Sequence, residues 1–341
     1  MINVFRITTT PSEHEEKTTW LELFFDLIYV AILIEMGNRL SHNLSLQGTV
    51  EFALLFVPIW LSWLEPAFYS RRFPTDDIGH RLLTMAYMVV IAIMAAEIHD
   101  VTGSTITAFL LAYAASKLIL ALMYARAWRH YPEYRVMTGT YAIVFTIAAL
   151  IWLFIALFAA RTFALWLVAT AFSLLAPFYL PLIRDWAGKG AVPRPPIKYH
   201  YLLDRFGELT IIVLGEFFIK AITGAADRQA YAITFFYGLC LVGVSLGVWW
   251  LYFDHLDHSS LTAAGAQPRT WADSHYLLLG ALAAYGVAAA KVLALEPGQA
   301  MADEKRYLLA GALAVVLLAI AVLEWTAPEK KGAMARRPQI G

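Results

Sequence analysis

The stretch WLELFFDLIYV (residues 20–30) opens the first long apolar run of the chain, and LDRFGELTIIV (residues 203–213) opens another in the second half. In both stretches an acidic residue is followed two positions later by phenylalanine and four positions later by a second acidic residue. Carboxylates four residues apart lie on one face of a helix. The recurring pattern indicates an internal duplication and places charged groups at the start of two apolar helices.

Composition decides the class of protein. Of the 341 residues, 60% are hydrophobic and only 15% are charged. A soluble core of this size cannot hide so much apolar surface, so the chain is expected to be an integral membrane protein. The apolar runs are continuous, whereas a membrane β-barrel would alternate apolar and polar residues. The predicted fold is therefore an all-α, polytopic transmembrane bundle of about ten helices.

The apolar runs have the length of membrane spans. A helix needs about 20 apolar residues to cross the hydrocarbon core of a bilayer. Runs approaching this length occupy residues 20–36, 50–64, 82–96, 106–125, 138–159, 163–182, 206–222, 231–253, 276–295 and 307–323. The fifth and sixth runs are separated only by residues 160–162, of which Arg161 is the one charged residue.

The distribution of basic residues among the loops predicts how the chain is oriented in the membrane. With ten spans both termini lie on one side, and Lys and Arg collect on that side in clear excess. By the positive-inside rule both termini are expected in the cytoplasm, in a multi-pass protein of the inner (plasma) membrane. Residues 1–19 are polar, so no cleavable signal is expected before the first span. The lone Cys240 lies in an apolar run, which argues against disulfides and a cysteine metal site.

Several other classes lack support. The formal net charge is zero and the basic residues are spread over short loops, so no nucleic-acid partner is expected. The chain has no phosphate-binding Gly-x-x-x-x-Gly-Lys loop, which argues against direct coupling to ATP hydrolysis. Tryptophans near span ends, such as Trp60 and Trp63, are expected to anchor helices at the membrane interface.

The duplication extends beyond the opening motif. His80 precedes the third span and His275 precedes the ninth, and each is followed by a matching Leu-Leu pair within three residues. Because six spans separate corresponding helices, both copies cross the membrane in the same direction, as in the parallel repeats of some transporters. The expected organisation is an N-terminal cytoplasmic segment (1–19), a four-helix repeat (20–130), a two-helix spacer with a Pro-rich linker (131–198), a second four-helix repeat (199–326) and a basic tail (327–341).

These motifs carry a resemblance. WLELFFDL at 20–27, RFG at 205–207, LGE at 214–216 and WLYFD at 250–254 resemble the bacterial low-temperature-requirement A family, from about residue 17 to about residue 325. Where that family is expected to have HLxERFG, this chain has YLLDRFG at 201–207, which shortens one acidic side chain. The resemblance implies a polytopic bacterial inner-membrane protein associated by name with growth in the cold. It implies no established reaction.

The acidic residues of the two motifs are the main candidate site. Pseudo-symmetry would bring four carboxylates to one cytoplasmic-side vestibule: Glu22, Asp26, Asp204 and Glu208. Neighbouring like charges and desolvation both disfavour the ionised form, so the sequence predicts a proton or cation site. The alternative is that Arg205, or Arg72 from the first cytoplasmic loop, forms ion pairs that only hold helix ends together.

Two further charged residues lie deep in predicted spans. Glu216 has apolar neighbours on both sides, and a mid-membrane carboxylate is a candidate functional group. Lys220, one turn later, is its alternative ion-pair partner. Lys117 in the fourth span is expected to pair with an acid from another helix, which the sequence does not identify.

Asp254, Asp257 and His258 fall on one helix face if the eighth span continues. Acid and imidazole at this spacing can bind a divalent metal, the one cofactor that the sequence suggests. The alternative is a hydrated helix end. His80 and His275, whose side chains titrate near neutral pH, would add to a proton function on the same side of the membrane.

Three functions remain open. The first is a proton- or cation-coupled secondary transporter of an unknown small solute or cation, which should have a cavity reaching Glu216. The second is a membrane-embedded, metal-dependent enzyme acting on a lipid or isoprenoid head group, in which Asp76 and Asp77 would approach the Asp254 cluster. The third is a non-catalytic structural or sensory bundle with every acid paired to Arg or Lys. Membrane lipids are partners in all three, and the sequence leaves the oligomeric state open.

Overall fold

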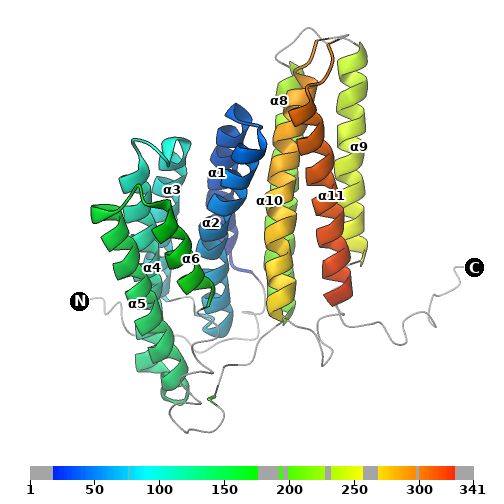
Figure 1. The fold of residues 1–341 in the computed structure, drawn as a ribbon. Coiled ribbons are helices and arrows are strands. Elements are labelled where there is room, and N and C mark those ends of the chain that lie inside the picture. Colours follow the sequence, from blue (N-terminus) through cyan, green and yellow to red (C-terminus); the bar gives the residue numbers. More distant parts are fainter. Residues whose placement is uncertain are drawn as a thin grey trace, which may run out of the picture. The chain divides into compact units, whose positions relative to one another are not determined.

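The structure is a computed structural model that describes residues 18–75, 77–175, 192–193, 195, 199–226, 232–255, 268–296 and 299–326. Within these ranges it contains ten α-helices, two short 3-10 helices and no strand (Figure 1). The predicted all-α fold of about ten helices is confirmed.

The chain divides into two compact units, Met1–Arg205 and Phe206–Gly341, called unit 1 and unit 2. The described helices of unit 1 are α1 (Trp20–His42), α2 (Leu46–Arg72), α3 (Ile78–Glu97), α4 (Ile106–His130), α5 (Arg135–Phe158) and α6 (Phe163–Leu174). Those of unit 2 are α9 (Ala232–His255), α10 (Pro268–Leu293) and α11 (Asp303–Thr326). α8 (Tyr199–Ala226) begins in unit 1 and continues as the first helix of unit 2.

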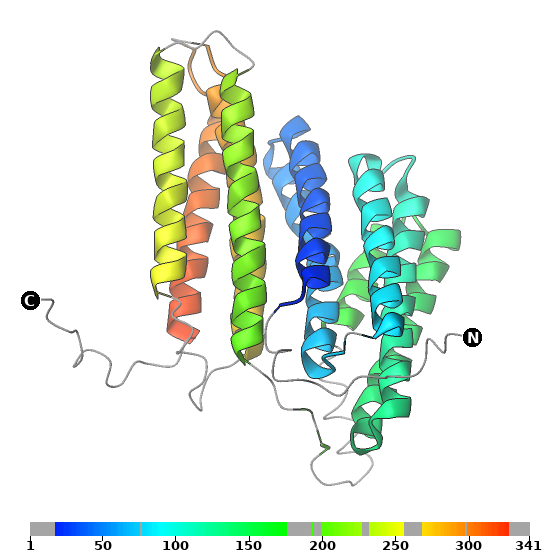
Figure 2. The same cartoon turned by 180° about the vertical axis from the view of Figure 1, so that it is seen from behind.

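Helix packing places α5 and α6, the described helices of the predicted spacer, in unit 1. In unit 1, α1 packs on α3 and α3 on α4 (Figure 2), while α5 packs along α4, and α6 contacts α5 and α2. In unit 2 the main contact is between α10 and α11. The two helices expected to form a spacer, α5 and α6, therefore complete unit 1. The parallel four-helix repeat stays a prediction.

Seven described helical segments have the length and composition of membrane spans: Leu46–Arg72, Ile78–Asp100, Ile106–His130, Pro132–Phe158, Phe235–Asp254, Trp271–Leu293 and Asp303–Trp325. The length and apolar composition of these segments show that the protein is a multi-pass membrane protein. α1 has comparable length, but four charged side chains interrupt its sequence: Glu22, Asp26, Glu35 and Arg39. A helix of this kind needs protein or water beside its charged face.

Capping residues fix where the first helices begin. Thr19 caps α1 and Ser45 caps α2, each accepting a hydrogen bond from a backbone N–H three residues later. Asp77 caps α3 in the same way through the N–H of His80, at 3.0 Å. Such caps satisfy backbone donors that a helix start leaves without partners.

Two prolines interrupt the hydrogen bonding of α2. Pro66 has no N–H, so the carbonyl of Ser62, four residues earlier, loses its partner within the helix. The hydroxyl of Tyr87 in α3 donates to this carbonyl at 2.8 Å. The hydrogen bond to the carbonyl that Pro66 leaves without a helix partner thus joins α3 to α2 in the core of unit 1.

Candidate functional site

The first turn of α1 positions Glu22. Its carboxylate accepts hydrogen bonds from the backbone N–H and the hydroxyl of Thr19, at 2.9 and 3.0 Å, and the Thr19 hydroxyl accepts from the Glu22 N–H. This reciprocal capping box occupies one carboxylate oxygen, Oε2. The other oxygen, Oε1, faces α8.

Asp26 lies one turn deeper on the same face of α1 and is completely buried. Its Oδ1 accepts hydrogen bonds from Nε1 of Trp63 in α2 at 2.7 Å and from Nη2 of Arg205 in α8 at 2.6 Å. Its Oδ2 is buried and has no hydrogen-bond partner within the part of the chain that the structure describes. One oxygen is therefore fixed by two donors, and the other can accept a proton.

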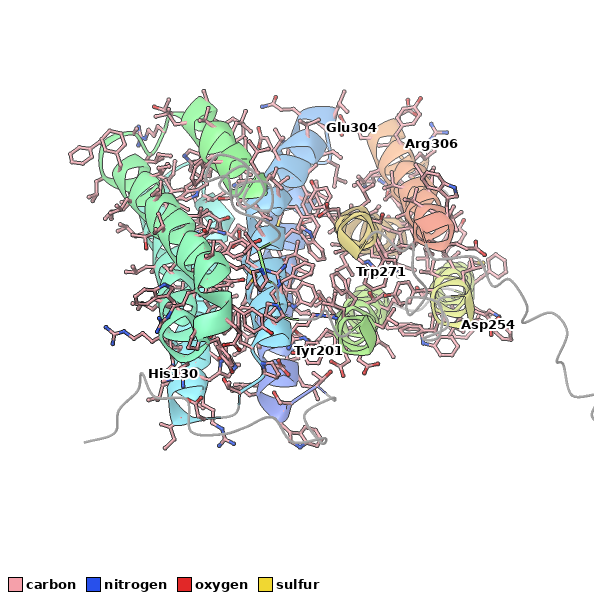
Figure 3. All side chains as sticks on the ribbon, turned by 90° about the horizontal axis from the view of Figure 1, so that it is seen from below. His130, Tyr201, Asp254, Trp271, Glu304 and Arg306 are labelled. Carbon is pink, nitrogen blue, oxygen red and sulfur yellow. The ribbon has the colours of Figure 1, made fainter. Side chains whose placement is uncertain are left out.

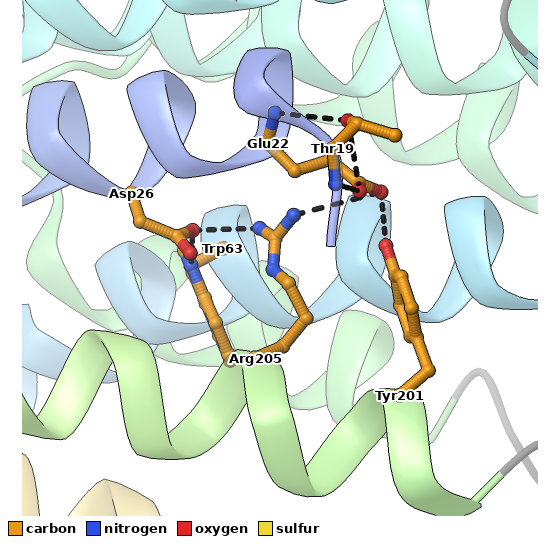
Figure 4. Close-up of polar contacts among 6 residues, drawn as sticks. All are labelled: Thr19, Glu22, Asp26, Trp63, Tyr201 and Arg205. Carbon is orange, nitrogen blue, oxygen red and sulfur yellow. Dashed lines mark hydrogen bonds and ion pairs between the residues drawn. The ribbon is translucent and has the colours of Figure 1, made fainter. Parts of the chain in front are cut away.

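Arg205 connects the two acids (Figure 4). Its Nη2 bonds to Asp26, and its Nη1 lies 3.6 Å from Oε1 of Glu22. The hydroxyl of Tyr201, one turn before Arg205 on α8, donates to the same Glu22 oxygen. We call Glu22, Asp26, Trp63, Tyr201 and Arg205 the acidic site.

The surroundings of the acidic site are apolar. The guanidinium of Arg205 lies over the rings of Phe25 and Trp63, with 5.9 and 5.8 Å to the ring centroids. Cation–π contact partly replaces the hydration that a buried guanidinium loses. Two ionised carboxylates against this guanidinium leave one uncompensated negative charge, which burial penalises and one added proton would remove.

A small cavity adjoins the acidic site. Its volume is about 20 Å³, which is room for about one water molecule. Glu22 and Arg205 line it together with Ser70, Thr84 and Tyr87. The acidic site therefore shares the wall of this cavity with polar side chains of α2 and α3.

Lys117 has its partner in α2. Its Nζ bonds to Oε2 of Glu65; the Lys117 side chain is fully buried, and that of Glu65 is 10% exposed. The ammonium also lies 4.7 Å from the ring centroid of Tyr113. We call Glu65 and Lys117 the inner pair.

Three of the acidic residues predicted to form a site belong to α8. Asp204, Glu208 and Glu216 are all half-buried along this helix. Lys220 belongs to α8, but its side chain lies outside the described atoms. Glu22, Asp26 and Asp204 belong to unit 1 whereas Glu208 belongs to unit 2, so the vestibule of four acids stays a prediction.

A second cluster lies where α3 begins and α4 ends. Arg126 forms a buried ion pair with Asp77. Desolvation raises the pKa of the Asp77 carboxyl, but hydrogen bonds from Arg126 and from the His80 N–H outweigh it and hold the pKa below its ordinary value. His80 stacks on Tyr69, with ring centroids 6.2 Å apart.

Arg72 was one of the expected partners of the α1 acids. Its guanidinium lies 5.6 Å from the ring centroid of Tyr141 in α5 and interacts with the Tyr124 hydroxyl of α4. Arg205 is the arginine that contacts Glu22 and Asp26.

His275 is completely buried in unit 2, and both ring nitrogens have partners. Nδ1 lies 2.9 Å from the carbonyl of Trp271, and Nε2 lies 2.8 Å from the hydroxyl of Tyr252. A carbonyl only accepts, so Nδ1 carries a proton and, in the neutral ring, Tyr252 donates to Nε2. The contact joins α10 to α9.

The expected metal site is only partly described. Asp254 is exposed near the end of α9 (Figure 3), whereas Asp257 and His258 lie outside the described residues, as does Asp76. Within the described ranges no group of three or more His, Cys, Asp or Glu side chains is arranged to hold a metal.

Three participants were not identified from the sequence. Trp63 was expected at the membrane interface, but it is fully buried and donates to Asp26, so that expectation is wrong. Glu65 was missed because the predicted span ends at residue 64, whereas α2 continues to Arg72. The apolar residues that follow Glu65 and Pro66 were the signal in the sequence that the helix continues past residue 64. Nothing local marks Tyr201.

Comparison with known proteins gives a family and one curated relative. The family model described as bacterial low temperature requirement A protein matches residues 17–337. Over 207 residues the chain is 28% identical to an uncharacterized protein of Rhizobium meliloti (strain 1021), covering 59% of this chain and 50% of the relative. The chain thus matches about half the length of that relative. No solved structure gives a significant match.

Proposed function

The chain belongs to the bacterial low temperature requirement A family, and from the chemistry of its acidic site we propose that this member is a proton-coupled secondary transporter of the bacterial inner membrane. The proposed cargo is a small solute or cation, and the proposed orientation has both termini in the cytoplasm. Asp26 is the proposed proton acceptor.

One observation carries the proposal. Two buried carboxylates, those of Glu22 and Asp26, share the guanidinium of Arg205, and Oδ2 of Asp26 has no hydrogen-bond partner within the described residues. A proton on Oδ2 neutralises the site without displacing Trp63 or Arg205 from Oδ1. Carboxylates that exchange one proton within a membrane helix bundle are the usual parts of proton-coupled pumps and transporters.

The position of Arg205 supports a coupled movement. Tyr201 and Arg205 lie on the first two turns of α8, and both bind acids of α1. Protonation of Asp26 weakens its attraction to Arg205 and so loosens the start of α8 from α1. The same helix carries Asp204, Glu208 and Glu216, which we propose as the continuation of the path for a proton or cation.

A structural bundle is the second candidate, and the pairing of the acids favours it. Glu22 and Asp26 contact Arg205, Glu65 contacts Lys117, and Asp77 contacts Arg126. A buried ion pair is costly to break, because removal of one partner leaves the other charge buried and uncompensated. The two candidates differ in what a neutral isostere does to stability and to transport.

The test is Asp26→Asn in the full chain, purified and placed in liposomes with an internal pH-sensitive dye. Under an imposed pH gradient, sodium, potassium and a panel of small amines are added one at a time. We expect wild-type protein to move protons in response to one of these compounds. Asparagine keeps the shape of aspartate but cannot ionise, so Asp26→Asn should abolish the response while melting close to the wild-type temperature.

Glu51→Gln is the matched control, because Glu51 forms an exposed ion pair with Arg39 in the same unit. It should transport as wild type does. The structural candidate instead predicts that Asp26→Asn lowers the free energy of unfolding by about 3–5 kcal/mol and that adding Arg205→Gln restores much of this loss. That pattern, or full transport by Asp26→Asn, would refute the proposal.

A further inference from the structure

We propose that a pocket between the end of α1 and the start of α2 binds a small zwitterion, an α-amino acid with an apolar side chain. The pocket has a volume of about 280 Å³, and all the residues that line it belong to unit 1. We call it the α1–α2 pocket. Its wall includes Arg39, Leu40, Glu51, Phe52 and Leu55.

Two opposite charges lie side by side in this wall. Nη2 of Arg39 in α1 is 3.7 Å from Oε2 of Glu51 in α2, which is longer than a hydrogen bond. The two side chains are 22% and 37% exposed, and a loose ion pair of this kind adds little to stability. The Glu51 Oε2 therefore has room for a donor, and the guanidinium has N–H groups to spare for an acceptor.

Neutral groups hold each charge in position. Nη1 of Arg39 donates to the His99 carbonyl at 3.2 Å, and its Nη2 donates to the Thr102 hydroxyl at 3.1 Å. His99 belongs to the 3-10 helix η2 (Ile98–Asp100), which packs on α1. Gln47, one turn before Glu51, donates to Oε1 of Glu51 at 3.0 Å. Charged groups that are already oriented lose little freedom when a ligand binds, which favours affinity.

The turn between α1 and α2 supplies a further donor. Asn43 also lines the pocket, and its Oδ1 accepts from the N–H and the hydroxyl of Ser45 at 3.3 and 2.7 Å. A Cβ atom at Gly48 would lie 2.1 Å from the Asn43 carbonyl oxygen, so only glycine permits this close approach. Because Oδ1 is occupied, the amide N–H groups of Asn43 are the end that can donate to a ligand.

The charges of the wall select the class of ligand. A lone anion would be attracted by Arg39 but repelled by Glu51, and the reverse holds for a lone cation. An α-amino acid carries a carboxylate and an ammonium on one carbon, so it can bind Arg39 and Glu51 at the same time.

The apolar part of the wall selects among amino acids. Leu40, Phe52 and Leu55 are buried residues that line the same pocket. An apolar side chain placed against them leaves water, which adds to the affinity. A few fixed polar groups beside apolar side chains are the usual composition of a site for a small molecule.

The inference goes beyond the proposed function and does not rest on it. Arg39 follows Asp26 on α1 by 13 residues, which is about 20 Å of helix rise. The α1–α2 pocket and the acidic site thus lie at opposite ends of this helix. Loss of charge in the pocket is not expected to change proton movement at Asp26, so Glu51→Gln stays a control for that movement. With cytoplasmic termini, the pocket lies on the outer side of the membrane.

The test is isothermal titration calorimetry of the full-length protein in lipid nanodiscs at neutral pH, with leucine as the probe. Isocaproate is leucine without the ammonium, and isoamylamine is leucine without the carboxylate. Glycine lacks the apolar side chain. We expect leucine to bind at one site and the other three compounds to bind at least about 10-fold more weakly.

Two variants assign the charges. Glu51→Gln should weaken the binding of leucine about 10-fold or more without weakening that of isocaproate, because only the partner of the ammonium is lost. Arg39→Gln should weaken leucine to a similar extent without weakening isoamylamine. A variant that merely distorts the pocket would weaken all the compounds together, so the change in selectivity separates binding from structure.

Glu35→Gln and Arg161→Gln are the matched controls, since both residues belong to unit 1 and neither lines the pocket. Both should bind leucine as the wild type does. The inference is wrong if wild-type protein does not bind leucine at millimolar concentration, or if isocaproate or isoamylamine binds as tightly as leucine. Unchanged selectivity in both Glu51→Gln and Arg39→Gln would also overturn it. Proton movement at Asp26 is measured separately, so none of these results decides the proposed function.

Discussion

Arg205 is the residue on which the geometry of the acidic site depends. One guanidinium contacts two carboxylates that lie one turn apart on α1, and it reaches them from the start of another helix. Tyr201 and Trp63 each add one hydrogen bond to these carboxylates. A lysine could not replace it, because a single ammonium lacks the planar fork of donors that serves two acceptors at once.

At Asp77 the contributions of charge and of helix capping to the free energy of unfolding can be measured separately. Asp77→Asn keeps a good helix cap but removes the charge that faces buried Arg126, and we expect a loss of about 3–5 kcal/mol in the free energy of unfolding. Asp77→Ala should cost about 1 kcal/mol more, because the cap is lost as well. Thermal or denaturant unfolding in detergent measures both.

The same residue predicts a pH dependence. The pKa of Asp77 is depressed in the folded protein, so its stabilisation is present above the unfolded pKa of about 3.9 and is lost as the pH falls through the folded value. Wild-type protein should therefore lose melting temperature below about pH 4. The Asp77→Asn variant should show a smaller loss over that range, and equal slopes for the two proteins would contradict the assignment.

At the scale of elements, α2 is the helix that joins the two buried sites of unit 1. Trp63 binds Asp26, and two residues later Glu65 binds Lys117. Pro66 follows directly and releases the Ser62 carbonyl to Tyr87 of α3. A helix with unbroken hydrogen bonds could not offer that carbonyl, so the proline is part of how α2 and α3 are held together.

This relation predicts a double-mutant cycle. Tyr87→Phe should destabilise the wild-type protein by about 1–3 kcal/mol, because the Ser62 carbonyl is left buried without a donor. In a Pro66→Ala background the alanine N–H can bond to that carbonyl within the helix, so Tyr87→Phe should cost clearly less. Additive losses in the cycle would show that the two residues act independently.

At the scale of the whole molecule, each unit carries a Tyr–His contact between two consecutive described α-helices. Tyr69 and Tyr252 lie three residues before the ends of α2 and α9. Each contacts a histidine of the next described α-helix, His80 in the first turn of α3 or His275 about two turns into α10, with ring centroids 6.2 and 5.7 Å apart. The duplicated Leu-Leu-flanked histidines of the sequence thus have similar tyrosine neighbours in both units.

A parallel repeat makes a prediction for topology. Cys240 is the only cysteine, so Cys240→Ser gives a background in which single cysteines report their side of the membrane. With cytoplasmic termini, Gln47→Cys in unit 1 and Glu296→Cys in unit 2 should react with a membrane-impermeant maleimide in intact cells. Glu133→Cys and Glu324→Cys should react only after the membrane is permeabilised. Opposite results for the two units would mean that the repeats are inverted.

The sequence by itself determined the class of the protein, the approximate number of helices within the described ranges and the residues at which charge interrupts them. These are local properties, because apolar length and capping chemistry act over a few turns of one helix. The sequence also marked Glu22, Asp26, Arg205 and Lys117 as residues that need partners.

Only the tertiary structure decided the partners. Arg205 reaches Glu22 and Asp26 across more than 170 residues of chain, and Lys117 reaches Glu65 across 52. Hydrophobic periodicity fixes which face of a helix avoids charge, but it does not fix the neighbour or the rotation of that helix. Those are set by side-chain packing of the whole unit, which brought Trp63 and Tyr201 to acids that no local pattern linked to them.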